Sequence, residues 1–194
     1  MWHIDQTVLR VADGSRVFIR AIIDNYSRYI LSWQVSDNYG GTRSKELIQS
    51  AWQQLTASSR KPEPPNLLMD SGTENVNKDV DRILKSTGIT RTIAQIDVEF
   101  SNSMIERFFR TIKHRWLYFR SLPNIESVRQ ATAKFMHEYS NIIPHSALGG
   151  ATPFEVFTGK WTKTEQIALV QLNEVARENR RHENLNSSCG FCPV

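Results

Sequence analysis

The chain has 194 residues, of which 40% are hydrophobic and 23% are charged. This is the composition of an ordinary globular protein, and the length allows one domain with a substantial core and a small appendage. No apolar run approaches the length of a membrane span, and the first residues lack the basic start and apolar stretch of a signal peptide. We therefore expect no membrane partner and a cytoplasmic location.

Positive charge is concentrated in one stretch of the chain. The net charge is +4, and residues 101–145 alone carry seven Lys or Arg against three Glu, an excess of four. A face that meets a polyanion would show this pattern, but so would a solvated helix face. Taken alone, the charge favours the solvated helix face.

Alternation of apolar and polar residues predicts strands near the N-terminus. In the first of them, Trp2, Ile4 and Val8 share one face and Asp5 lies on the other. Asp13-Gly14 is a hairpin-turn signal that follows this strand. Three antiparallel strands in a meander are expected, at residues 2–10, 16–23 and 29–35.

Helices and short strands alternate after the meander. Short strands are expected at residues 66–69 and 89–93, and helices at about 42–56, at 76–84 with Gly88 as the stop, and around Glu106. A further helix is marked by the apolar stripe Ile125, Val128, Ala131, Phe135 and Tyr139. This order predicts the α/β class, with a five-stranded mixed sheet (a three-strand antiparallel meander plus two short strands) flanked by helices.

Asp70 follows the short strand 66–69, and ligands of α/β sheets gather at the carboxyl ends of strands. Gly72 allows a tight backbone turn beside it. Asp70 could instead cap the next helix, a role for which Asn75 is the closer competitor.

Glu106 belongs to a helix whose core face is clear from its spacing. Ile105, Phe108, Phe109, Ile112 and Trp116 follow the helical period and should face the core. Glu106, Arg110 and Lys113 form a second stripe at the edge between core and solvent, where a carboxylate can reach a metal and cations can reach phosphates. The alternative is a capping box that starts at Ser103 and uses Glu106 to bind a backbone N–H.

Asp5 lies among apolar residues of a strand expected at the centre of the sheet, where an acid without a partner would be unstable. We therefore favour it as a metal ligand over Asp24, which has a structural explanation at a turn. Carboxylate oxygens suit Mg²⁺ or Mn²⁺, and two such ions are a recurrent device for cutting and joining phosphodiesters. Thirty-five residues separate Asp70 from Glu106, and the three acids together point to nucleic-acid chemistry.

Five segments resemble the integrase catalytic core (DDE type) of bacterial insertion-sequence transposases and retroviral integrases. They lie in the order and spacing of that family and span roughly residues 1–159. The segments are D-Q-T at 5–7, I-I-D-N-Y-S-R at 22–28, D-S-G-T-E at 70–74, S-M-I-E-R-F-F-R-T-I-K at 103–113 and N-I-I-P-H-S-A-L-G-G-A-T-P at 141–153. The last segment makes the bacterial transposase branch the nearer one.

The resemblance implies a ribonuclease H-like fold and a metal-dependent DNA strand transferase. Such an enzyme nicks the ends of a mobile element and joins the 3′-hydroxyl to target DNA, in DNA integration and recombination. Asp5, Asp70 and Glu106 would be the catalytic residues and the ligands of two Mg²⁺ (or Mn²⁺) ions, with Asp5 bridging both. Arg110 and Lys113 would bind DNA phosphates. The partners would be element ends and target DNA at the bacterial nucleoid, bound by a homodimer or larger assembly without a small-molecule cofactor.

The chain also departs from the family pattern. The N-terminal region that reads element ends is not among these residues, and Ser71 stands where Asn or Arg is common. Beyond Lys160 the resemblance fades, so we expect a catalytic core at 1–160 and a charged helical extension with a disordered tail at 161–194. A catalytic fragment, a truncated remnant and one product of a split reading frame are all compatible with this. A hydrolytic nuclease and a catalytically silent DNA-binding or oligomerising remnant are the alternative functions.

Three smaller features have structural interpretations. Thr152-Pro153-Phe154-Glu155 is a capping box with proline at the first helical position. His145 could touch DNA, but we favour a hydrogen-bonded structural histidine. Cys189 and Cys192 form a C-x-x-C without the further ligands of a zinc site, and we interpret the pair as incidental.

Overall fold

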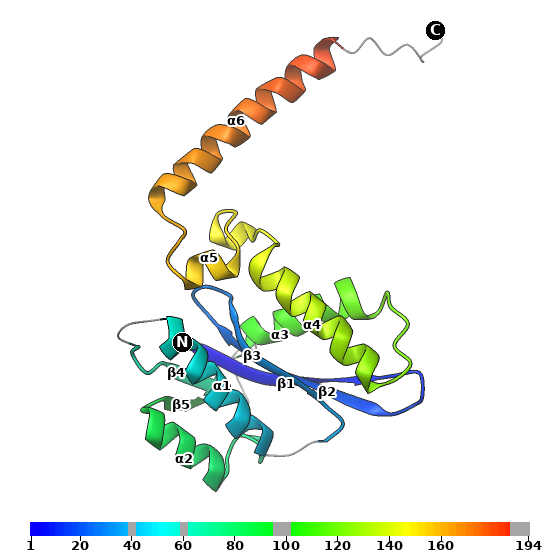
Figure 1. Cartoon of the computed structure of the whole chain (residues 1–194), viewed down its shortest axis with the longest axis vertical. Coiled ribbons are helices and arrows are strands. Elements are labelled where there is room, and N and C mark those ends of the chain that lie inside the picture. The colour runs from blue at the N-terminus through cyan, green and yellow to red at the C-terminus, as the bar shows by residue number, and fades with distance from the viewer. Residues whose placement is uncertain (39–41, 59–61, 95–101, 187–194) are drawn as a thin grey trace.

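The computed structural model describes residues 1–38, 42–58, 62–94 and 102–186 (Figure 1). Five strands form one mixed sheet in the order β3-β2-β1-β4-β5. The strands are β1 (Trp2–Arg10), β2 (Arg16–Asp24), β3 (Ile30–Ser36), β4 (Asn66–Met69) and β5 (Thr90–Ile93). The first three are antiparallel, and β4 and β5 add in parallel to β1. The predicted mixed sheet, with its meander and two short strands, is confirmed.

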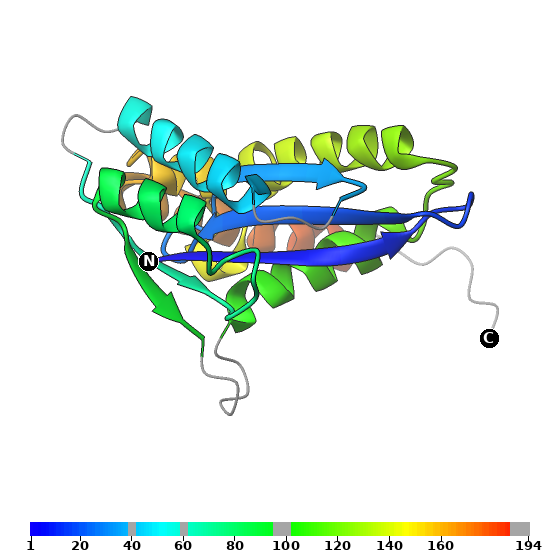
Figure 2. The same ribbon diagram turned by 90° about the horizontal axis from the view of Figure 1, so that it is seen from below.

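The helices cover both faces of this sheet. They are α1 (Thr42–Ser58), α2 (Lys78–Thr87), α3 (Ser103–Ile112), α4 (Ile125–Asn141), α5 (Pro153–Phe157) and α6 (Lys163–Asn186), with a π-helical turn at Lys113–Leu117 and a 3₁₀ turn at Ser146–Leu148. Buried residues of α1 and α2 pack with Ile22 and Met69 in one core, and those of α3 and α4 pack with Ile19 and Ile23 in the other. Figure 2 shows the strands lying between α1 and α3.

The central strand β1 faces both cores. Trp2 and Ile4 are buried against α1 and α2, and Leu9 is buried on the other face with α3 and α4. Val8, predicted to share the face of Trp2, is 46% exposed. His3 is buried although it belongs to the face predicted to be polar.

Helix α2 begins two residues later than its apolar spacing predicts. Asn77 is the N-cap, and its side chain accepts from the backbone N–H groups of Asp79 and Val80. Val76 consequently lies in the preceding turn and is 44% exposed. The helix ends as predicted at Gly88, whose φ of 75° is the left-handed conformation that glycine adopts without strain.

Helix α3 buries the predicted core stripe of Ile105, Phe108, Phe109 and Ile112. Its continuation widens into the π-helical turn, in which the N–H of Tyr118 donates to the Lys113 carbonyl at 3.0 Å. This change of pitch rotates the later side chains, so Trp116 is only partly buried against the core. Short π-helical insertions often lie near functional sites.

The last elements lie outside the sheet. The predicted capping box at Thr152 is present, with hydrogen bonds in both directions to Glu155. Helix α6 projects away from the rest of the molecule, as Figure 1 shows, and none of its residues is buried. No helix in the described ranges is long and apolar enough to cross a membrane. Cys189 and Cys192 lie outside the described residues.

Candidate active site

The pairing of β1 with β4 brings two of the predicted acids together. Trp2 pairs with Leu67 and His3 with Leu68 in parallel register. Asp5 and Asp70 each lie two residues beyond the last of these pairs, and Asp70 is near enough to raise the pKa of Asp5. The carboxyl end of β4 therefore brings Asp70 next to the central strand.

Glu106 is held near the same point by a link between α3 and β1. Asn102, the N-cap residue of α3, donates from its amide to the Ile4 carbonyl at 3.1 Å. Its amide oxygen lies 2.8 Å from the Nδ1 atom of His3. His3 and Asn102 are both buried, and Glu106 follows one helical turn after Asn102. The start of α3 is thus fixed to the strand segment that carries Asp5.

The pKa of Asp5 shows that other acids lie near it. Burial is the main cause that raises the pKa of Asp5 to about 7, and repulsion from Asp70, Glu106 and Glu74 adds to it. The backbone N–H of Gln6, which donates to Asp5 at 2.7 Å, opposes this rise. Among the described residues, no cation forms an ion pair with Asp5, Asp70 or Glu106. These three acids therefore concentrate negative charge around Asp5.

The donor set of this cluster fits a hard divalent cation. Carboxylate oxygens are the preferred ligands of Mg²⁺ and Mn²⁺, and a cation would relieve the repulsion that raises the pKa of Asp5. In the described part of the chain, however, no three or more His, Cys, Asp or Glu side chains lie close enough together to hold a metal ion. The acids are neighbours in this structure without forming a closed coordination site.

A chain of hydrogen bonds holds the side chain of Asp70. It was not predicted from the sequence. The Asp70 carboxylate accepts from the Gly72 N–H at 3.2 Å and, through a short bond, from the Asn75 amide. The amide oxygen of Asn75 in turn accepts from the Ser44 hydroxyl of α1 at 3.1 Å. The interpretation of Asn75 as a helix cap is wrong, because Asn77 caps α2. Asn75 instead orients the carboxylate of Asp70.

A fourth acid, Glu74, lies near Asp5 and was not predicted as a site residue from the sequence. It is buried and accepts from the Gln6 amide at 3.1 Å, and the Gln6 oxygen accepts from Arg20 at 2.9 Å. A Cβ atom on Gly72 would lie 2.5 Å from the Glu74 carboxylate, so glycine at this position makes room for that side chain. Its place in the D-S-G-T-E segment was the available signal.

Glu106 does not form the alternative capping box. Ser103 is the first residue of α3 rather than its cap, and the Glu106 carboxylate makes no hydrogen bond with the described residues. It lies exposed beside Arg110 in a groove of about 650 Å³ that runs along α3. Lys113 is half-buried in the first position of the π-helical turn, and burial lowers the pKa of its ammonium group.

The competing residues have structural roles. The Asp24 carboxylate accepts from the backbone N–H of Ser27 at 2.8 Å and from its hydroxyl at 2.6 Å, which closes the β2–β3 turn. His145 packs edge-on against Tyr139 at 4.6 Å, and burial lowers the pKa of its imidazole. The interpretation of Asp24 agrees with this arrangement, and the structural interpretation of His145 stays a prediction.

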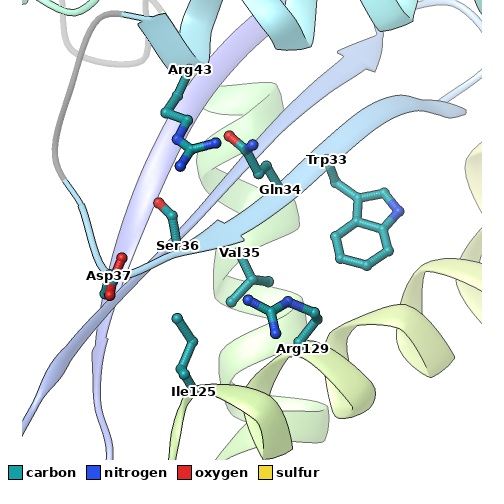
Figure 3. Close-up of a pocket in the computed structure, with 8 residues that line it drawn as sticks. All are labelled: Trp33, Gln34, Val35, Ser36, Asp37, Arg43, Ile125 and Arg129. Carbon is teal, nitrogen blue, oxygen red and sulfur yellow. The ribbon is translucent and has the colours of Figure 1, made fainter.

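A groove of about 460 Å³ between β3, α1 and α4 lies apart from the carboxylates (Figure 3). Its two arginines point into it from α1 and α4, but Arg43 is paired with Glu46 and Arg129 with Glu126. Because its cations are neutralised by neighbours one helical turn away, this groove has little capacity to attract an anion.

The strand order, the helices on both faces and the acids around the centre of the sheet define a ribonuclease H-like domain. Two family models, both described as integrase core domain, match residues 1–96 and 91–153. The chain belongs to the integrase core family of transposases and integrases.

Several of its curated relatives come from bacterial insertion elements. An uncharacterized protein of insertion element IS136 from Agrobacterium fabrum is 24% identical over 161 residues, covering 82% of this chain and 83% of that protein. The putative transposase InsK of IS150 from Escherichia coli is 24% identical over 154 residues, covering 79% of this chain. The chain spans about half the length of InsK, of which 53% is covered.

Solved structures share the fold at low identity. The HTLV-2 integrase catalytic core domain in complex with magnesium superimposes with a TM-score of 0.62 and 16% identity, covering 80% of this chain and 93% of that one. The Mos1 transposase catalytic domain, solved with raltegravir and magnesium, gives a TM-score of 0.58 and 10% identity, with 70% and 69% covered.

Proposed function

We propose that this chain is the catalytic core of a DNA strand transferase that nicks the ends of a mobile element and joins the freed 3′-hydroxyl to target DNA. The observation that carries the proposal is the concentration of carboxylates at Asp5, with Asp70 and Glu106 near enough to raise its pKa and no cation paired with any of them in the described residues. Membership of the integrase core family supports the same chemistry.

The side chains divide into two roles in this proposal. Asp5, Asp70 and Glu106 would hold Mg²⁺ or Mn²⁺ ions, with Asn75 and Asn102 orienting two of these acids. Two bound ions would supply Lewis-acid activation of the attacking hydroxyl and neutralise charge at the phosphate.

The cations of α3 and its extension would act on the DNA backbone. Arg110 is exposed beside Glu106, and Lys113 follows one turn later. Phosphate contacts of this kind fix the position of DNA and carry little sequence information. We propose that a dimer or larger assembly performs the reaction on two element ends, in the bacterial cytoplasm.

The test uses an oligonucleotide duplex that carries the element end, incubated with Mg²⁺ or Mn²⁺. We expect metal-dependent nicking and a joined product from the parent chain and neither from Asp70→Asn, while the affinity for DNA stays within about threefold because phosphate contacts supply most of it. Asp24→Asn is the matched control, since this acid closes a turn and should retain activity. Equal activity of the parent and Asp70→Asn would refute the proposal.

A catalytically silent, DNA-binding remnant is the second candidate. One observation favours it: the described residues contain no group of three or more acids or other ligands spaced to hold a metal ion. Titration with Mg²⁺ separates the two candidates. Thermal stabilisation that is lost in Asp5→Asn supports the strand transferase, and DNA binding with neither stabilisation nor cleavage supports the remnant. Nicking without any joined product would identify a hydrolytic nuclease instead.

A further inference from the structure

A third groove, of about 530 Å³, is lined by residues of the β2–β3 turn, α3, the π-helical turn, α4 and the loop after α4. Three of its lining residues are arginines: Arg28 from the β2–β3 turn, Arg107 from α3 and Arg115 from the π-helical turn. Among the residues that the structure describes, no aspartate or glutamate lines it. We name this site the arginine groove.

The arginines of this groove are not neutralised by the protein. None of Arg28, Arg107 and Arg115 forms an ion pair with any described residue. Elsewhere in the described chain, arginines of α1, α2, β5 and α4 pair with nearby acids. Three unpaired guanidinium groups around one concave site favour an anionic ligand, and phosphate fits guanidinium geometry well.

Arg28 is held in place by its backbone and by side-chain contacts. Its φ of 64° is left-handed, and among the described non-glycine residues it alone has a positive φ. Its Nη1 atom donates to the Asn25 side-chain oxygen at 2.8 Å and approaches the Met104 sulfur at 2.7 Å. A long cationic side chain that is fixed in this way loses less rotamer entropy when it binds a phosphate.

Most of the remaining wall of the groove is apolar, and its polar members are Thr111, Tyr139, His145 and Ser146. Met104 and Trp116 line it from one side, and the exposed Ile143 and Pro144 line it from the loop after α4. A ligand that fills the groove must therefore offer a flat or apolar part as well as negative charge. Unpaired nucleotides have this combination, whereas duplex DNA hides the faces of its bases in the stack.

The arginine groove is continuous with the groove that contains Glu106. Both are lined by Met104, Arg107, Thr111 and Arg115, and together they form a path across α3 from Glu106 to the loop that follows α4. Each groove has the volume of a small-ligand site, so each can hold roughly one nucleotide. The path therefore fits a short strand rather than a single isolated ion.

We propose that the arginine groove binds an unpaired stretch of the DNA substrate, which crosses α3 from the carboxylate cluster to the loop after α4. The inference rests on the proposed action on DNA and adds a preference for a single-stranded end. A duplex with a short unpaired overhang should bind more tightly than the same duplex with blunt ends, and the difference should come from Arg28, Arg107 and Arg115.

Fluorescence anisotropy with EDTA, which removes any need for catalysis, tests this preference. Arg115→Ala and Arg28→Gly should each weaken binding of the overhang duplex by about tenfold at low salt. Each replacement should also make the slope of log affinity against log salt concentration shallower by roughly 0.7. Blunt-duplex binding should stay within about twofold of the parent. Glycine at position 28 suits the left-handed backbone, so this variant removes the guanidinium without adding strain.

Arg82→Ala, on the exposed surface of α2, is the matched control. It should change neither the affinity for the overhang duplex nor the affinity for the blunt duplex. Because Arg115 is exposed in the folded chain, its replacement tests the proposal even if Arg28→Gly fails to fold. Equal losses for blunt and overhang duplexes would overturn the proposal, because the arginines would then be general phosphate contacts. Preference for an acidic peptide over every oligonucleotide would overturn it as well.

Disulfide cross-linking locates the bound strand. In a Cys189→Ser, Cys192→Ser background, Ala147→Cys should capture an overhang base that carries an activated disulfide, and Lys85→Cys on α2 should not. Equal capture at both positions would contradict the inference. Overhang preference without DNA cleavage would refute only the strand-transferase proposal, and cleavage without overhang preference would refute only the arginine groove.

Discussion

Asp5 is a buried carboxylate with three other carboxylates close enough to repel its negative charge. Its pKa is raised from an ordinary value of 3.8 to about 7, first by burial and then by repulsion from Asp70, Glu106 and Glu74. Between these two pH values the folded chain binds a proton at Asp5 that the unfolded chain has released. The contribution of Asp5 to stability is therefore full below pH 3.8 and is lost as the pH rises to about 7.

We expect Asp5→Asn to remove part of the pH dependence of stability. Between pH 5.5 and pH 8 the free energy of unfolding of the metal-free parent should fall by about 2 kcal/mol more than that of Asp5→Asn. The reason is that about one and a half pH units of this window lie below the Asp5 pKa of about 7. Urea unfolding of both chains in EDTA measures the two free energies of unfolding. His3 and His145 have lowered pKa values and an opposite pH dependence, but their contribution is the same in both chains and cancels in the difference. If the two chains differed in free energy of unfolding by the same amount at both pH values, the pKa of Asp5 would not be raised.

Asn75 is the residue that most directly controls the carboxylate of Asp70. It donates to Asp70 and accepts from the buried Ser44 hydroxyl, so its amide cannot rotate freely. Asn75→Asp would keep the shape but replace the donor by another anion, and metal-dependent cleavage should fall by about 10–100-fold. Product formation at several Mg²⁺ concentrations measures this loss. Asn77→Asp, at the nearby N-cap of α2, should retain cleavage because aspartate also caps helices.

At the scale of elements, the junction of β1 and α3 determines how Glu106 approaches the sheet. Asn102 bonds both His3 and the Ile4 carbonyl, and all of these groups are buried. Asn102→Ala leaves the two partners unsatisfied and should destabilise the fold by about 2–3 kcal/mol. It should also lower cleavage by about 10–100-fold under conditions where the variant is fully folded, because Glu106 loses its fixed approach.

Asn124→Ala is the matched control for this junction. Asn124 is also a helix N-cap, and its capping box with Ser127 begins α4 at a distance from the acids. Its loss should reduce stability by about 1 kcal/mol and leave the cleavage rate of the folded protein unchanged. Denaturation curves and initial rates, measured on both variants, separate a positioning role from a loss of stability. If both variants lost activity in proportion to their stability, Asn102 would have no positioning role.

These elements also show what a sequence can and cannot reveal. Strand alternation and the helical period located the sheet and the buried stripe of α3, because burial on one face leaves a direct pattern in the chain. The bond between His3 and Asn102 joins positions 99 residues apart, and no local pattern encodes it. The π-helical turn was missed for a different reason, since a fixed period of 3.6 residues cannot describe a change of pitch.

The site was predictable to the extent that its acids lie at recognisable ends of elements. Asp70 follows a buried strand and Glu106 lies in the first turn of an amphipathic helix, so both could be proposed from their context. For Glu74 the one signal was its place in the D-S-G-T-E segment, and Asn75 had none, because a polar residue in a loop gives no sign of being buried. Their burial results from the approach of β1 and α1 to that loop.

At the scale of the whole molecule, the sheet with α1 to α5 forms the packed body, and α6 extends from it (Figure 1). No residue of α6 is buried, and its contact with the body is at its start, where Leu169 lies over the 149–150 turn. We propose that residues 1–160 are the catalytic core and that the remainder is an extension. A helix without tertiary contacts has only its own hydrogen bonds to stabilise it.

The amide hydrogens of α6 should consequently exchange much faster than those of α4. Residues 172–186 are exposed and have no packed face to stabilise them, so they should open with a free energy near zero, whereas α4 opens with most of the core. Hydrogen exchange at low protein concentration should show protection in α4 that is at least about a thousandfold greater. Equal protection of the two helices would mean that another surface covers α6. If that protection fell on dilution, the surface would belong to a second copy of the chain, and the assembly proposed for strand transfer would include this helix.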